Sequence, residues 1–123
     1  MENLSNVEVK AGQYKSTEMV DFTLYKPKTH SLPKRVMKEI LPHLRPISEN
    51  WDTYYAEQII CEVQKNAQEK VRLSIWQPKD TKYLSIWVFW EDVDHEWHPS
   101  KNGLKLSKEE LDQALPQLEA LLS

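Results

Sequence analysis

Aliphatic residues occupy every second position in two neighbouring segments near the middle of the chain. Val71 to Trp76 and Tyr83 to Trp90 both show this pattern, which is typical of a strand with one buried face. The turn sequence Gln77-Pro78-Lys79-Asp80 separates them, so we expect an antiparallel pair. A strand at the end of Thr53 to Gln64, with Tyr55, Ile59, Cys61 and Val63 on one face, and a short strand with Leu104 and Leu106 complete a predicted four-stranded sheet.

Helical spacing of apolar residues appears in two other segments. From Ser31 to Leu44 the spacing predicts a helix that starts near Pro33 and is broken by Pro42 and Pro46, with a connector over 45–52. Ser107 opens a second helix, because Glu110 stands three residues later and can complete a capping box. The apolar stripe of this second helix consists of Leu111, Leu115, Leu118 and Leu122.

The N-terminal region adds a strand before the first helix. Residues 1–15 are polar and are expected to be frayed, with Val7 and Val9 as candidates for a short edge strand. Met19 to Tyr25 alternates as a half-buried strand. The sequence therefore predicts one α+β domain over 1–123. A strand–helix element at 19–46 precedes a four-stranded antiparallel sheet with a C-terminal helix at 53–123.

The two predicted helices share a weak repeat with an offset of 74 residues. Chance similarity between amphipathic helices is the simpler explanation, and a duplicated strand–helix unit is the alternative. The first copy consists of Leu32, Lys34, Met37, Ile40, Leu41, Pro42 and Leu44, and the second of Leu106, Lys108, Leu111, Ala114, Leu115, Pro116 and Leu118.

Composition narrows the function classes. No apolar run is long enough for a membrane span, and the N-terminus lacks the apolar core of a signal peptide, so an intracellular protein is expected. The single cysteine, Cys61, fits a reducing compartment. Two glycines are too few for phosphate-binding loops. No nucleophile–base arrangement is evident, so we expect neither an enzyme nor a cofactor.

Charge is distributed unevenly along the chain, whose net charge is −3. The segment from Lys26 to Arg45 contains six basic residues and one acidic residue, a local charge of +5. The segment from Glu91 to Glu96 contains four carboxylates. The acidic turn contains Asp92, Asp94, His95, Glu96 and His98, which are ligand types for metals. Carboxylates are common in turns without a metal, and no metal site is expected.

The segment from Arg72 to the C-terminus resembles the positive cofactor four family of transcriptional coactivators, which bind single-stranded DNA. The resemblance implies a homodimer formed through the C-terminal helix. Trp87, His98 and Asn102 stand where the family has basic residues. The additional strand–helix element and the repeat make the whole chain similar to plant Whirly proteins. The matching residues are Ser85, Ile86, Phe89, Trp90, Asp92, Glu96, Pro99, Lys101, Gly103, Leu104, Lys105, Leu106 and Ser107.

One face of the predicted sheet combines aromatic rings with cationic and small polar groups. Bases stack on such rings while cations hold the phosphates. We therefore expect binding of single-stranded DNA or RNA. The candidate residues are Arg72, Trp76, Lys82, Tyr83, Trp87, Phe89, His98, Lys101 and Lys105, together with Lys34, Arg35 and Lys38 of the basic helix. The alternative is a protein–protein interaction module of the same fold, in which these aromatic residues contact a partner or pack internally.

Overall fold

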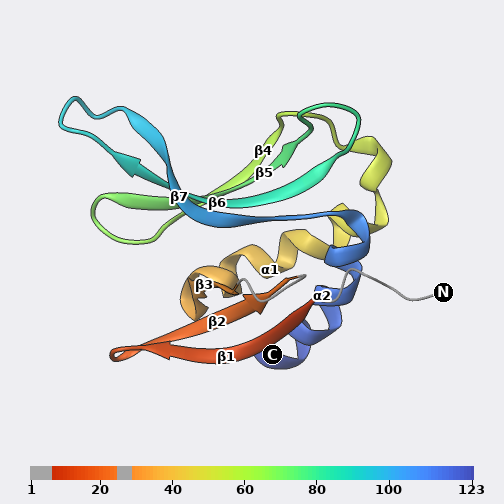
Figure 1. The fold of residues 1–123 in the computed structure, drawn as a ribbon, viewed down its shortest axis with the longest axis horizontal. Helices are drawn as coiled ribbons and strands as arrows, with labels where there is room; N and C mark the ends of the chain where they lie inside the picture. The colour runs from red at the N-terminus through yellow and green to blue at the C-terminus, as the bar shows by residue number, and fades with distance from the viewer. Residues whose placement is uncertain (1–6, 25–28) are drawn as a thin grey trace.

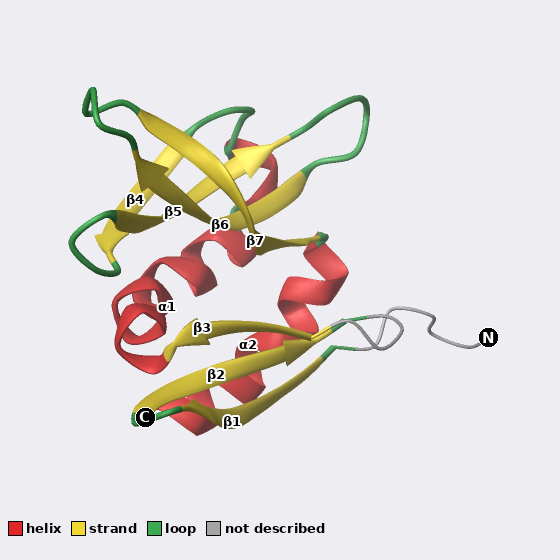
Figure 2. Ribbon diagram, turned by 60° about the vertical axis from the view of Figure 1, so that its left-hand side comes forward, coloured by secondary structure: helices red, strands yellow, loops and turns green. Residues whose placement is uncertain are grey.

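The computed structural model describes residues 7–24 and 29–123, which form two antiparallel sheets with two helices between them (Figures 1 and 2). The first sheet contains β1 (Glu8–Tyr14), β2 (Thr17–Thr23) and β3 (Thr29–Pro33). The second contains β4 (Ile59–Gln64), β5 (Glu69–Trp76), β6 (Tyr83–Glu91) and β7 (Trp97–Leu106). The helices are α1 (Lys34–Glu49) and α2 (Lys108–Leu122), and a 3₁₀ turn, Trp51–Thr53, follows α1. The expected α+β fold is confirmed. Neither helix of the described chain has the length and apolar character to cross a membrane.

Strict alternation places the core side chains of β5 and β6 against the helices. Each of these aliphatic side chains is at most 1% exposed, as the sequence pattern predicts. The two strands pair in antiparallel register, with Leu73 opposite Ile86. Because successive strand residues point to opposite sides, the intervening side chains face away from the helices. The buried set is Val71, Leu73, Ile75, Leu84, Ile86 and Val88.

The N-terminal segment is ordered along β1, and the prediction that residues 1–15 are frayed is wrong there. β1 pairs with β2 from Glu8 to Tyr14. The backbone N–H groups of Val7 and Val9 donate to the side-chain oxygens of Gln113 and Gln117 on α2. These bonds pair backbone groups at the start of the free edge of β1 and anchor this end of the strand to α2. Residues 1–6, and Tyr25, Lys26 and Lys28 of the predicted strand and basic segment, lie outside the described residues.

Helix α1 continues through both prolines, which corrects the prediction that they end it. It begins at Lys34, because Leu32 and Pro33 belong to β3, and it ends at Glu49. Pro42 and Pro46 are exposed and lie one turn apart, so water can bind the carbonyl groups that lack helical partners. Burial of the opposite side of the helix offsets the lost hydrogen bonds. The buried residues there are Val36, Met37, Ile40, Leu44 and Ile47.

Strand β4 buries only part of the face that the sequence predicts for it. Val63 is buried, but Ile59 and Tyr55 are 52% and 65% exposed. An irregularity between Ile59 and Cys61 shifts the register with β5, which turns Ile59 out of the core. Partial burial raises the pKa of the Cys61 thiol, so this cysteine is a weak nucleophile.

The two strand–helix units occupy equivalent positions in the fold. Both helices follow a strand directly, and Lys108 begins α2 74 residues after Lys34 begins α1. Arg45 forms a bidentate pair with Glu119, at 2.8 and 2.6 Å, and the same offset separates these two residues. When a residue of one repeat contacts the equivalent residue of the other repeat, both lie near an approximate two-fold axis that relates the two repeats. This contact supports the duplicated unit over chance similarity.

Helix α2 buries its leucine stripe inside the same chain. Ser107 and Glu110 form the predicted capping box at its start. Leu111, Leu115 and Leu118 are at most 2% exposed, and α2 contacts α1, β1, β6 and β7. The stripe is therefore not free to form the predicted homodimer interface. Within this chain α1 and β1 of the N-terminal part pack against α2.

We expect Leu118→Ala to destabilise the monomer rather than to separate two subunits. Truncating this fully buried leucine should lower the free energy of unfolding by about 2–5 kcal/mol. Urea denaturation measures the change, and Leu121→Ala, at a partly buried position, is the control with a smaller effect. Sedimentation should show the same monomeric mass for the parent and both variants. A dimeric parent and a stable monomeric Leu118→Ala variant would contradict the assignment.

Candidate nucleic-acid interface

The side of β5, β6 and β7 that points away from the helices carries a cluster of aromatic and cationic side chains, here called the aromatic face. Its rings are half-buried rather than fully covered by other parts of the described chain. The cluster contains the predicted aromatic residues and thus confirms that they share one side of the sheet. Its members are Lys70, Arg72, Ser74, Trp76, Tyr83, Ser85, Trp87, Phe89, Trp97 and Lys105.

At one end of the aromatic face, a lysine lies over two neighbouring rings. The ring centroids of Trp76 and Tyr83, which pair across β5 and β6, are 5.7 Å apart. The ammonium of Lys105 lies 4.5 Å from the Trp76 centroid and 5.6 Å from that of Tyr83. Lys105 is exposed and forms no ion pair with any described residue. It can therefore contact a phosphate next to a base stacked on either ring.

At the other end, two cations lie over rings and share one carboxylate. Arg72 lies 4.1 Å from the Phe89 centroid, and Lys70 lies 4.3 Å from that of Trp97. The Glu62 carboxylate on β4 accepts hydrogen bonds from both cations, at 2.7 and 2.9 Å. Partial burial alone would raise the pKa of Glu62, but these hydrogen bonds and charges lower it below its ordinary value. Glu62 is ionised at neutral pH and offsets part of the positive charge.

Trp87 is held at the centre of the face by a bulge in β7. Between the pairs Trp87–Gly103 and Phe89–Pro99, β7 contains two more residues than β6. The bulge brings the Ser100 carbonyl within 2.8 Å of the indole N–H of Trp87. A Cβ atom on Gly103 would lie 2.4 Å from the indole, and its φ of 156° also favours glycine. This segment therefore fixes the tryptophan ring and displays Lys101, which is exposed.

The aromatic face is hollowed into a shallow depression of about 370 Å³. Five predicted residues line it, with Trp87 and Phe89 near the bulge and Trp76 towards the turn between β5 and β6. Residues before and on β4 form one rim. Glu57 and the exposed Ile59 belong to this rim, so the depression combines apolar and cationic side chains with one carboxylate. The five predicted residues are Arg72, Trp76, Trp87, Phe89 and Lys105.

Two predicted binding residues lie elsewhere. Lys82 donates hydrogen bonds to the carbonyl groups of Trp51 and Tyr54, at 2.9 and 2.6 Å, and so anchors the connector after α1. His98 pairs with Trp90 on the opposite side of the sheet, with ring centroids 4.9 Å apart. Both corrections follow from strand alternation, since each residue neighbours a residue of the aromatic face in sequence.

The basic residues of α1 form a separate cluster. Lys34 pairs with Glu18 at 3.2 Å, and Lys38 is exposed without an ion pair in the described chain. Arg35 donates hydrogen bonds to the carbonyl groups of Gln64 and Lys65 at the end of β4. Arg35 is thus a structural tie between α1 and the second sheet, which the sequence did not predict.

Two residues of the aromatic face were missed by the sequence analysis. Lys70 precedes Arg72 by two positions, so alternation assigns it to the same face. Trp97 also lies on this face, because two extra residues in the β7 bulge preserve the alternation back from Lys105. Extending the predicted strand at Val71–Trp76 towards the N-terminus would have assigned Lys70 to this face. Trp97 could be assigned only once the full length of β7 was known.

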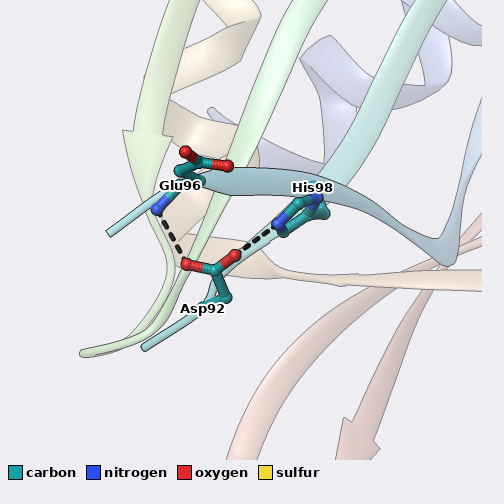
Figure 3. Close-up of side chains that lie close together, drawn as sticks. All are labelled: Asp92, Glu96 and His98. Atoms are coloured by element: carbon teal, nitrogen blue, oxygen red, sulfur yellow. Dashed lines mark hydrogen bonds and ion pairs between the residues drawn. The ribbon is translucent and has the colours of Figure 1, made fainter. Parts of the chain in front are cut away.

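The acidic turn between β6 and β7 brings together Asp92, Glu96 and His98, whose ligand atoms lie within 4.8 Å of one another (Figure 3). One Asp92 oxygen accepts the backbone N–H groups of Asp94 and Glu96, and the other lies 2.6 Å from the His98 ring nitrogen. The backbone bond from Glu96 and then the His98 bond lower the pKa of Asp92. These groups are metal-ligand types, but closing the turn already accounts for their arrangement.

Comparison with known proteins finds a family match to β5, β6, β7 and the first part of α2. Residues 65–115 match the family model described as Transcriptional Coactivator p15 (PC4), which is less than half of the chain. No curated protein sequence matches the chain.

Two crystal forms of a PC4 homolog from Burkholderia pseudomallei K96243 are similar in structure. The tetragonal form has a TM-score of 0.50 at 24% identity and is matched over 100% of its chain and 55% of this one. The orthorhombic form has a TM-score of 0.49 at 25% identity and is matched over 92% of its chain and 55% of this one. Together with the family model that matches residues 65–115, this shows that the C-terminal half of the chain resembles the PC4 family.

Proposed function

We propose that the protein binds single-stranded nucleic acid on the aromatic face. The observation that carries the proposal is the alternation of half-buried rings and cations along that face. Lys105 lies over Trp76, and Arg72 lies over Phe89, each within 4.5 Å of a ring centroid. An aromatic ring contributes about 1–3 kcal/mol per stacked base, while neighbouring cations neutralise phosphates. The resemblance of residues 65–115 to the PC4 family supports this proposal.

Single strands fit this surface better than a duplex does. The rings lie in a shallow depression on a sheet, where unpaired bases can be laid flat. Bases in a duplex are stacked on each other and expose only their edges. Trp87 is the central platform, because its indole is fixed by Ser100 and supported by Gly103.

A protein partner is the second candidate occupant, and Glu62 is the observation that favours it. Its carboxylate pairs with both Lys70 and Arg72 and offsets one of their two positive charges, which leaves less positive charge for phosphates. A peptide with an apolar side chain and a basic residue would fit the hollow beside Glu62 and Glu57. The steepness of the salt dependence helps to distinguish the two occupants, because each protein cation that contacts a phosphate releases a counterion and steepens the loss of affinity with salt.

Trp87→Ala and Trp76→Ala should each weaken binding of a fluorescent single-stranded oligonucleotide by about 10- to 100-fold. Fluorescence anisotropy measures the affinity, and duplex of the same sequence should bind more weakly than the single strand. Trp90→Ala is the matched control, because this 43% exposed tryptophan lies on β6 but faces the opposite side. Unchanged affinity in both face variants, or equal affinity for duplex, would contradict the proposal.

Glu62→Gln should tighten oligonucleotide binding by about 3- to 10-fold at low salt, because it releases Lys70 and Arg72 for phosphate contacts. The slope of log affinity against log salt should become steeper by up to about 1.4, or about 0.7 for each phosphate neutralised. Glu49→Gln, at an exposed position at the end of α1, makes the same change in net charge and is the control. Weaker binding of the Glu62→Gln variant would favour a basic protein partner instead.

A further inference from the structure

A second hollow, of about 850 Å³, lies on the side of the molecule where three connections meet. The tip between β1 and β2, the first turns of α1 and the turn between β4 and β5 all lie on the left in Figures 1 and 2. Residues from all three segments line this hollow, here called the basic groove. The lining includes Tyr14, Glu18, Lys34, Arg35, Lys38 and Lys65.

The basic groove carries more cations than carboxylates. Four basic side chains line it, against Glu18 and Glu39. The pair between Lys34 and Glu18 is exposed, with Glu18 72% accessible, so it contributes little and can exchange for a phosphate. Lys38 is exposed with no ion pair among the described residues. Two lysines are therefore available to a polyanion in this groove.

The start of α1 adds to this positive potential. No side chain caps the helix, and its first turn contains no acidic residue. Its first backbone N–H groups and the positive end of its dipole therefore lack the neutralisation that the capping box and acidic first turn give α2. Arg35 fixes this helix end beneath β4 through the carbonyl groups of Gln64 and Lys65.

The basic groove and the aromatic face meet at one tight turn. On the aromatic side, Lys70 lies over Trp97 and stands opposite Gln64 in the β4–β5 register. On the helix side, Lys65 pairs with Glu69 at 3.1 Å and lines the groove. The β4–β5 hairpin thus carries residues of both surfaces, with Lys70 on the aromatic side and Lys65 in the groove.

We propose that a single strand bound on the aromatic face continues over the β4–β5 turn into the basic groove. Lys34 and Lys38 neutralise its phosphates there, and Tyr14, 64% exposed at the tip of β1, offers a ring for a further base. This inference rests on the proposed function and extends its site to a second surface contributed by the N-terminal half. The occupant is a single-stranded nucleic acid longer than the aromatic face can accommodate.

The test compares two lengths of oligonucleotide on one double variant. Lys34→Gln with Lys38→Gln removes the two available cations and leaves the structural Arg35 in place. Anisotropy titrations at several salt concentrations would use single strands of about 6 and about 20 nucleotides, which lie within and above the range of about 4–16 nucleotides bound by one single-strand-binding OB fold. Lys10→Gln with Lys108→Gln is the matched control, since both lysines are exposed and lie outside both surfaces.

The double variant should bind the long strand about 10-fold more weakly than the parent at low salt, with a salt slope shallower by up to about 1.4. Its affinity for the short strand should stay within about 2-fold of the parent, as should the control with either strand. Equal losses for both lengths, or no loss for the long strand, would overturn the continuation into the groove while leaving the aromatic face intact. A parent that binds neither strand would overturn both proposals.

Discussion

Burial of the two apolar helix faces against each other and against both sheets is the constraint on which this structure depends. Neither sheet has a second apolar layer of its own among the described residues, and each helix contacts strands of both sheets. Ile40 and Leu44 of α1 and Leu111 and Leu118 of α2 are fully buried in this shared layer. Removing either half would expose the apolar face of the other. The four-stranded unit that resembles the PC4 family is therefore stabilised here by its own N-terminal extension.

The two halves differ on their outer surfaces. The aromatic face of the second sheet carries rings and cations, whereas the outer side of the first sheet is filled with short polar contacts. Asp21 lies against Gly12 and accepts a hydrogen bond from Ser31 at 2.6 Å. Thr23 and Thr29 bond across the neighbouring strands. The first sheet thus packs against the helices on one side and carries polar contacts on the other.

Sequence alone predicted the parts of the structure that depend on local periodicity. Alternation along β5 and β6 assigned Leu73 and Ile86 to the core and Trp87 to the aromatic face, because one buried side fixes the register. The same alternation places Lys82 and His98 off the aromatic face, because each is adjacent in sequence to a residue whose side chain lies on that face. The predicted first helix ended too early, since proline usually breaks a helix. In the structure α1 continues past Pro42, because burial of its apolar side outweighs the local cost of the proline. Arg35 could not be assigned, because its partners, the carbonyl groups of Gln64 and Lys65, are defined only by the packing of α1 beneath β4.

The pair between Arg45 and Glu119 joins two helices of one polypeptide, whereas in a two-subunit arrangement the equivalent residues would belong to separate chains. Docking of the helices is therefore an intramolecular step with a fixed effective concentration set by the connecting chain. Dilution cannot separate them, so the fold and its outer face persist at concentrations where a dimer would dissociate. The two halves are also inherited as one polypeptide, so the outer side of one can change without the same change in the other.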